Sequence, residues 1–149
     1  MAKPLPVTWL AGKRVRLRPL ETEDVPLLRR FGLPLGSRGT IFIVQTTKGR
    51  DIGTLGFAIR GRQAAIGLNM DSKRRWTDGS AAEALRLMRE GAFLSQPLVR
   101  MESLVRVDQP VVLAAFRRAG FKKEGVLRSA LSLRQIFKDA SIVSALANG

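Results

Sequence analysis

The chain lacks cysteine, histidine and tyrosine, three side chains that carry much of enzyme chemistry. Without cysteine there is no disulfide, no thiolate zinc site and no cysteine nucleophile. Without histidine there is no Ser-His-Asp triad, no imidazole base and no His-ligated metal. The absence of tyrosine also removes the phenol as a general acid. The candidates for proton transfer are therefore the 12 carboxylates and the lysines.

Long hydrophobic runs are also missing. No segment approaches the ~20 consecutive apolar residues that a membrane-spanning helix needs. The segment before Leu10 lacks the apolar stretch and the cleavage site of a signal peptide. We therefore expect a cytoplasmic protein with no membrane contact. A length of 149 residues predicts a single domain, residues 1–149, that folds without a disulfide or structural metal.

Acidic residues are few, and this makes the chain strongly basic. It has 26 Lys and Arg against 12 Asp and Glu, a net charge of +14. Basic residues cluster at 13–18, 73–75 and 117–123. Such a charge attracts polyanions, which include nucleic acids, anionic lipids and multiply phosphorylated cofactors. The alternative is a generally basic, solvated surface, because basic residues occur along the whole chain.

Hydrophobic periodicity predicts an alternation of strands and helices. The expected first helix has Thr22 as its N-cap and ends at Gly32. A later helix begins at Pro110, where a missing N–H costs nothing, and ends at Gly120. The order predicts an α+β (α/β) fold with a mixed central sheet. The remaining expected elements are strands at 14–18, 41–44, 52–59, 64–70, 99–107, 126–133 and 136–145 and a helix at 80–94.

The loop after Met70 has the residues of an anion site. Gly79, Ser80 and Ala81 are small, so a ligand can approach the first N–H groups of the following helix. The basic residues 73–75 add attraction for phosphate. The alternative is an ordinary helix start, in which Asp78 or Ser80 caps the helix and nothing binds. The loop is not a Walker A sequence, because it has no Gly-Lys-Ser/Thr.

Several segments, in order, resemble the GNAT superfamily of acyl-CoA N-acyltransferases, in the branch of the ribosomal-protein N-terminal alanine acetyltransferases. The pattern Trp76-x-x-Gly79-x-Ala81 resembles the pyrophosphate loop of that family. The Gly120-Phe121-x-x-Glu124-Gly125 pattern resembles a signature near its end. The segments that carry the resemblance are residues 12–20, 51–56, 65–71, 76–85, 119–128 and 137–139.

The resemblance implies a GNAT-type, mostly antiparallel sheet and an N-acetyltransferase that uses acetyl-CoA and no metal. Backbone amides of residues 79–82 then hold the pyrophosphate, and the strand that ends at Met70 binds the pantetheine arm. A neutral amine attacks the thioester, and proximity supplies much of the rate. The implied cofactor-binding residues are Leu68, Asn69, Met70, Trp76, Thr77, Asp78, Gly79, Ser80, Ala81, Ala82, Gln109 and Phe116.

The chain departs from the family at the start of the late helix. Gln109 stands where relatives have Asn, and Val112 where they have Ser or Ala. Phe116 stands where many relatives carry the Tyr that protonates the leaving thiolate, and Phe has no proton to give. The simpler explanation of Val112 and Phe116 is that they are helix core. An alternative function is therefore a catalytically impaired GNAT-fold module that binds acyl-CoA or nucleic acid.

The general base is the least defined member of the site. Glu102 matches a position where relatives often carry Glu, on the face of its strand opposite to Met101 and Ser103. As a surface carboxylate paired with a nearby arginine, it needs no function. The alternatives are Glu21, Glu23 and Asp24, near the first helix.

The resemblance implies an amine acceptor, either a protein N-terminus or a small molecule. The segment that shapes the acceptor pocket in relatives lies between the first helix and Ile41, and here it is short compared with most of them. This length predicts an open site or one that a partner chain completes, as in a homodimer. The basic surface predicts contact with RNA or the ribosome.

Overall fold

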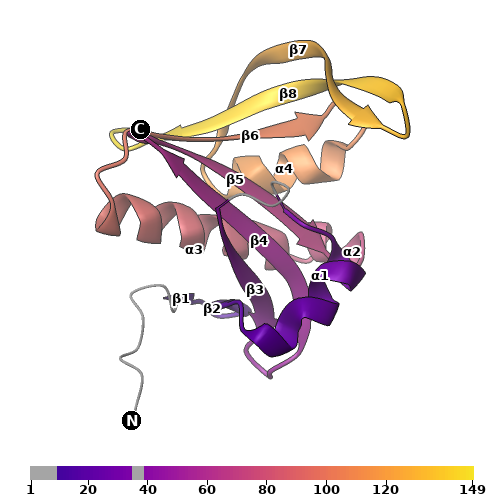
Figure 1. Cartoon of the computed structure of the whole chain (residues 1–149). Helices are drawn as coiled ribbons and strands as arrows, with labels where there is room; N and C mark the ends of the chain where they lie inside the picture. Colours follow the sequence, from indigo (N-terminus) through magenta and orange to yellow (C-terminus); the bar gives the residue numbers. More distant parts are fainter. Residues whose placement is uncertain (1–9, 35–38) are drawn as a thin grey trace.

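The computed structural model describes residues 10–34 and 39–149, and its centre is one sheet of eight strands (Figure 1). The strand order is β1-β2-β3-β4-β5-β6-β8-β7. Neighbouring strands are antiparallel except β5 and β6, which are parallel. The predicted mixed, mostly antiparallel sheet is confirmed. The strands are β1 Leu10–Ala11, β2 Val15–Pro19, β3 Thr40–Thr46, β4 Asp51–Arg60, β5 Gln63–Met70, β6 Arg100–Arg106, β7 Lys122–Leu133 and β8 Ile136–Leu146.

Helices lie on both faces of the first half of the sheet. α3 packs against β2, β5 and α4, and α1 packs against β4. β4 is buried at every position from 52 to 57, because a strand that is covered on both faces has no solvent-facing side. The helices are η1 Thr22–Asp24, α1 Val25–Phe31, α2 Arg74–Thr77, α3 Ser80–Ser95 and α4 Pro110–Arg118.

The hydrophobic core lies between the sheet and α3. Apolar residues at helical spacing place one side of α3 in this core, as the sequence predicts. They pack with buried side chains of β2, β4 and β5, among them Leu17, Leu55 and Ile66. The buried α3 positions that the spacing predicts are Ala81, Ala84, Leu85, Met88 and Ala92.

The start of the first helix differs from the prediction. Glu21, not Thr22, occupies the N-cap, and Thr22 lies inside the 3₁₀ turn that precedes α1. The Glu21 N–H donates to Asp24 Oδ2 at 2.8 Å, which is one half of a capping box. Hydrogen bonds from Arg18 hold the pKa of Asp24 below its usual value, against the effect of burial. The prediction was wrong because Asp24 binds back to β2 and to the Glu21 amide.

Two short elements, β1 and α2, were not predicted, since both are too short to show a period. β7 begins at Lys122, four positions before the expected start. The segment before Leu10 and the expected loop at Gly36 lie outside the described residues. In the described part of the chain, no helix has the length and apolar character needed to cross a membrane.

Candidate functional site

The candidate site begins where two neighbouring strands stop pairing. β5 and β6 pair only between residues 63–65 and 100–102. Beyond these residues β5 stays with β4, β6 continues along β8, and the two strands diverge (Figure 1). The second half of β5 therefore has a free edge. Its backbone N–H and C=O groups along that edge are available to a ligand.

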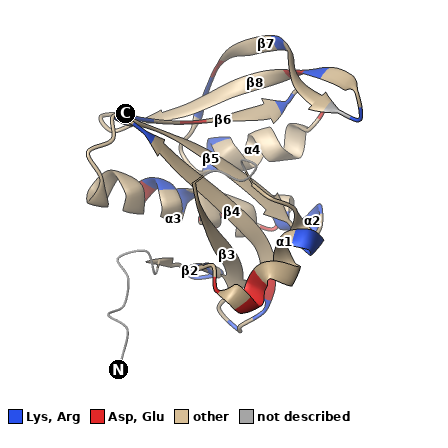
Figure 2. Ribbon diagram, viewed as in Figure 1, with Lys and Arg blue, Asp and Glu red and all other residues tan. Residues whose placement is uncertain are grey.

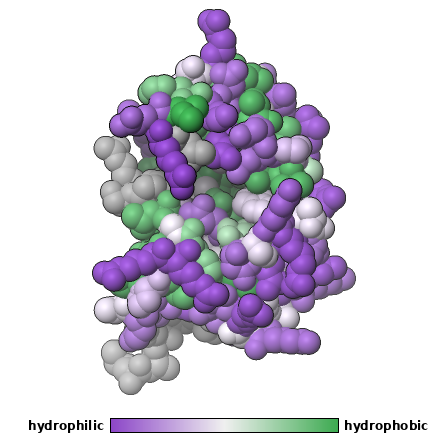
Figure 3. All heavy atoms as spheres, turned by 90° about the vertical axis from the view of Figure 1, so that its right-hand side faces the viewer, coloured by the Kyte–Doolittle hydropathy of each residue, from purple (hydrophilic) through white to green (hydrophobic). Residues whose placement is uncertain are grey.

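A cavity of about 800 Å³ lies in this divergence. That volume suits a small-molecule ligand. Figure 3 shows a hollow on this side of the molecule, with hydrophilic residues around it. The cavity also has apolar side chains in its wall, from α1, from the segment after it, and from β6 and β7. These are Phe31, Leu33, Leu104, Leu127 and Leu131.

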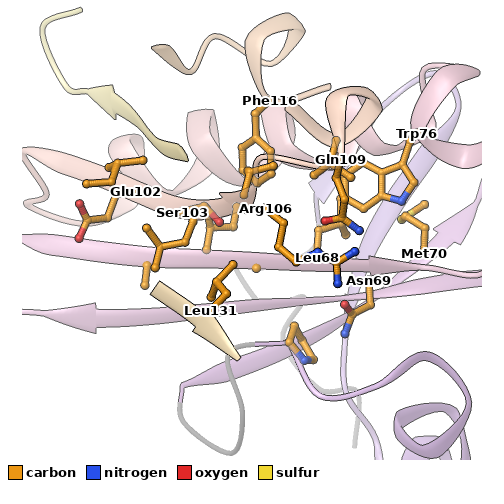
Figure 4. A pocket seen from close by; sticks show the side chains of 18 of the residues that line it. Leu68, Asn69, Met70, Trp76, Glu102, Ser103, Arg106, Gln109, Phe116 and Leu131 are labelled. Carbon is orange, nitrogen blue, oxygen red and sulfur yellow. The ribbon is translucent and has the colours of Figure 1, made fainter. Parts of the chain in front are cut away.

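The cavity brings together predicted site residues from four places in the sequence (Figure 4). The other predicted residues, 77–82, follow Trp76 in the chain but do not line the cavity. The site therefore has two parts, a cavity and an adjoining loop. The predicted residues in the cavity wall are Leu68, Asn69, Met70, Trp76, Glu102, Gln109 and Phe116.

The last residues of β5 face opposite sides of the sheet. Leu68 is buried in the core that α3 covers. Asn69 lies on the other face, next to Gly32, where an added Cβ would be 3.1 Å from Asn69 Nδ2. Gly32 also has φ 94°, a backbone conformation that favours glycine. Asn69 is thus the polar side chain that β5 presents beside α1.

The loop before α3 is held by its own residues. Gly79 is the N-cap and has φ 96°, which favours glycine. Asp78 Oδ1 accepts a hydrogen bond from the Ser80 N–H at 2.8 Å, so one predicted capping residue does hold the helix start. Burial raises the pKa of Asp78, but the bonds to Ser80 and the nearby Arg75 and Arg74 outweigh burial, and the pKa lies below its usual value. One of the amides that we expect to bind pyrophosphate, the Ser80 N–H, therefore already donates its hydrogen bond to a carboxylate.

The basic residues around this loop have different roles. Arg75 is buried and pairs with Asp71 at 3.2 Å and with Asp78 at 3.6 Å, so it stabilises the loop. Arg14, from the connection between β1 and β2, lies over the loop, and its Nε is 3.3 Å from where a Cβ on Gly79 would be. Lys73 and Arg74 are exposed. Sequence reasoning missed Arg14, because nothing in the spacing links residue 14 to residue 79.

α4 also lines the cavity. Its N-cap is Gln109, which lines the cavity together with Val112 and Phe116. Phe116 is 2% exposed and packs edge-on against Phe121, with ring centroids 5.2 Å apart. It is thus a core residue as well as part of the cavity wall. No proton donor stands at that position.

Glu102 lies where the strands part, opposite Ala65. Its carboxylate accepts hydrogen bonds from Arg100 Nε at 3.3 Å and Nη2 at 2.9 Å. Arg100 also binds Glu124, and this hydrogen bond lowers the pKa of Glu124. The alternative for Glu102, a carboxylate paired with a nearby arginine, is therefore present in the structure. Its side chain is 43% exposed, so a substrate can reach it.

Comparison with solved structures identifies the fold. An acetyltransferase of the GNAT family from Bacillus anthracis superposes with a TM-score of 0.78 and 14% identity, over 95% of this chain and 99% of that one. The chain has the GNAT fold. The spermidine/spermine N-acetyltransferase SpeG from Vibrio cholerae, in complex with manganese ions, superposes with a TM-score of 0.76 and 16% identity. The match covers 91% of this chain and 94% of that one.

A chimera of the spermidine N-acetyltransferase SpeG from Vibrio cholerae and hSSAT superposes with a TM-score of 0.77 and 17% identity. The match covers 91% of this chain and 96% of that one. At the level of sequence, no family model and no curated protein matches. The GNAT fold thus rests on the arrangement of the elements. In the described residues, no group of three or more His, Cys, Asp or Glu could hold a metal ion.

Within this GNAT fold, none of the alternative bases near the first helix, Glu21, Glu23 and Asp24, is among the described residues that line the cavity. Sequence reasoning also missed a cavity residue, Arg106, the last residue of β6. Its signal was the alternation of β6, in which residues 102, 104 and 106 share one face and Met101 and Val105 fill the core.

Proposed function

We propose that the chain is an N-acetyltransferase that moves an acetyl group from acetyl-CoA to an amine. One observation carries the proposal: the cavity where β5 and β6 diverge, beside the free edge of β5. Acetyltransferases, two of them named for spermidine, share the fold over more than nine-tenths of this chain. The low identity leaves the chemistry to be argued from the residues.

The free edge of β5 suits an extended ligand with amide groups. Pantetheine has two amides, which can pair with backbone groups of residues 66–70 much as a neighbouring strand does. Arg14 lies over the start of α3, and Arg74 is close enough to act on the charge of Asp78 there. Phosphates of the ligand would find these cations and a helix N-terminus. A phosphate that binds the Ser80 amide must displace Asp78 from it.

The transfer step forms a C–N bond and breaks the thioester C–S bond. The amine nitrogen loses a proton, and the sulfur leaves as a thiolate that takes one up. We assign to Glu102 the role of accepting the amine proton, directly or through water, because it lines the cavity at the point where β5 and β6 stop pairing. Phe116 has no proton for the thiolate, so water or the ammonium product supplies it. Proximity then contributes most of the acceleration.

Finer features belong to the same proposal. The resemblance to the ribosomal-protein alanine acetyltransferases makes a protein N-terminus one acceptor class, and small amines are the other. The net charge of +14 supports contact with RNA or the ribosome. Figure 2 shows Lys and Arg on many elements, a pattern that equally suits a solvated surface. Homodimer formation and a cytoplasmic location stay predictions.

A second candidate is a module that binds acyl-CoA without turnover. Two features favour it: the cavity has a phenylalanine, Phe116, with no proton to give, and the carboxylate of Glu102 is paired with Arg100. It shares the cavity and the β5 edge with the enzyme. The two candidates therefore predict the same ligand and differ only in turnover.

Calorimetry with acetyl-CoA and a free-thiol assay over an amine panel test both candidates. The panel includes an alanine-initiated peptide, a lysine-containing peptide acetylated at its N-terminus, and spermidine. Amine-dependent thiol release above hydrolysis supports the enzyme. Binding of acetyl-CoA without release on any amine supports the module. If acetyl-CoA does not bind, both candidates fail.

A further inference from the structure

Among the described residues that line the cavity, Arg106 is the one cation. It is the last residue of β6 and shares a face with Glu102 and Leu104, away from the core. In Figure 4 its side chain extends from β6 toward Asn69 and Gln109, and Glu102 lies at the opposite end of the cavity. The Arg106 side chain is 24% exposed, so it is shielded from solvent but open to a ligand.

One side of the Arg106 guanidinium, its Nε, has a hydrogen-bond partner among the described residues. Its Nε donates to Asp108 Oδ1 at 3.0 Å. No described residue accepts a hydrogen bond from the two terminal amino groups. Asp108 therefore fixes the plane of the guanidinium and leaves its outer edge open. Such an edge is the part of arginine that binds a carboxylate with two parallel hydrogen bonds.

The other charged side chain of the cavity does not offset Arg106. Among the described residues that line the cavity, Glu102 is the carboxylate, and Arg100 already binds it. On β6, the neighbour of Arg106 on this face is the apolar Leu104, whereas the polar Asn69 and Gln109 lie toward the end of its side chain (Figure 4). The ion pair with Asp108 offsets part of the charge of Arg106 but leaves the terminal amino groups open. Because a partly buried guanidinium attracts an anion more strongly than an exposed one does, this end of the cavity favours an anionic group.

We propose that the acceptor is an amine that also carries a carboxylate, and that Arg106 binds this carboxylate. The proposal rests on the transferase function and specifies its substrate class. The amine then lies near Glu102 and the carboxylate near Arg106. Along β6 these two residues are roughly 13 Å apart, at about 3.3 Å per residue. Acceptors of peptide length therefore fit better than glycine.

The charge of the whole chain acts in the same direction. A net charge of +14 draws anionic acceptors toward the protein and repels polyamines. Spermidine, with several positive charges, meets Arg106 and finds Glu102 already paired. The chain therefore selects against polyamines, at the approach to the protein and again inside the cavity.

The test compares each carboxylate with its neutral amide. The probes are glycine, 4-aminobutyrate, 6-aminohexanoate and alanyl-glutamate, with glycinamide, 4-aminobutanamide, 6-aminohexanamide and alanyl-glutamine as partners, and spermidine. Thiol release gives kcat/KM for each amine. We expect kcat/KM for each longer carboxylate to exceed that for its amide about tenfold or more, because a hydrogen bond between charged groups contributes enough free energy for such a ratio. Arg106→Gln should reduce this ratio to about one, mainly through KM.

Arg50→Gln is the matched control, because it removes the same charge from the turn before β4, where Arg50 is exposed. It should keep the ratio. Thermal melting checks that both variants fold. The proposal is overturned if wild-type protein does not prefer carboxylates, or if it prefers spermidine. It is also overturned if Arg106→Gln weakens acetyl-CoA binding and lowers all amines equally, because Arg106 then serves acetyl-CoA.

A binding experiment separates this proposal from the transferase function. Calorimetry titrates 6-aminohexanoate and its amide into protein saturated with CoA, and needs no turnover. Preference for the carboxylate that Arg106→Gln abolishes supports the anion site even if no amine is acetylated. Equal binding of the two probes, in a protein that releases no thiol, overturns the proposal.

Discussion

Two strand–helix units flank the cavity, and they contribute to it in different ways. The first unit is β5 with α3, joined by residues 71–79, and the second is β6 with α4, joined by residues 107–109. The first unit offers backbone groups: the free edge of β5 and the N-terminus of α3. The second unit offers side chains, among them Glu102, Arg106 and Phe116.

The two kinds of contribution differ in how far they depend on particular neighbouring side chains. A backbone edge exists wherever β5 lacks a partner strand, whatever the side chains are. A side chain acts according to what it touches, and each of the three in the second unit has a specific neighbour. Arg100 binds Glu102, Asp108 binds Arg106, and Phe121 packs on Phe116. Substitutions should therefore have local, separable effects in the second unit.

The largest expected effect is on stability, at Phe116. Phe116→Ala should lower the free energy of unfolding by about 3–5 kcal/mol, because it empties a core position that also lines the cavity. Chemical denaturation measures this value. Phe137→Ala, at a phenylalanine that is 64% exposed, should change it by less than about 0.5 kcal/mol. Similar losses in both variants would show that Phe116 is not part of the core.

Glu102→Gln should have the largest effect on transfer. If Glu102 accepts the amine proton, kcat falls about a hundredfold while acetyl-CoA affinity stays the same. Glu124→Gln is the control, because Glu124 binds the same Arg100 and its side chain is equally exposed, at 43%. Equal kcat values in the two variants would mean that Glu102 serves only to pair with Arg100. Steady-state thiol release gives kcat for both variants, and calorimetry gives their affinity for acetyl-CoA.

The sequence predicts the first unit better than the second. The Trp76-x-x-Gly79-x-Ala81 pattern and the periodicity of α3 follow from spacing, since glycine and small residues mark where a backbone must bend or be approached. The alternation of β6 puts residues 102, 104 and 106 on one face, but whether that face lines a cavity depends on where β6 leaves β5. The point of divergence has no signal in the sequence of either strand. The same limit explains Arg14, which reaches the loop from a distant connection.

Gly79→Ala tests the first unit. A side chain at φ 96° costs about 1–3 kcal/mol, and a Cβ here meets Arg14. We expect acetyl-CoA affinity to fall about tenfold as the loop shifts. Gly49→Ala is a matched control, because Gly49 has φ 94° and no atom within 4 Å of an added Cβ. It should destabilise the protein comparably and leave affinity unchanged. Calorimetry that shows equal losses of affinity would remove the loop from the binding site.

The smallest expected effect is a gain, at Asp78. Asp78→Asn keeps an oxygen that can accept from the Ser80 N–H but removes a negative charge from the start of α3. Acetyl-CoA affinity should rise about threefold at low salt and less at high salt, because salt screens the repulsion of phosphate. Glu90→Gln, which removes an equal charge from the exposed side of α3, should change affinity little.

The gain at Asp78 should also depend on pH in a defined direction. The pKa of Asp78 lies below its usual value, so the carboxylate stays charged at neutral pH and down to about pH 4. The wild type and Asp78→Asn should therefore differ in affinity across that range. The difference should close as the pH falls through the pKa of Asp78, where the wild type becomes neutral too. Calorimetry should give the same ratio of affinities, Asp78→Asn to wild type, at pH 7 and at pH 5. A ratio that is smaller at pH 5 than at pH 7 would mean that the pKa of Asp78 is too high for this account.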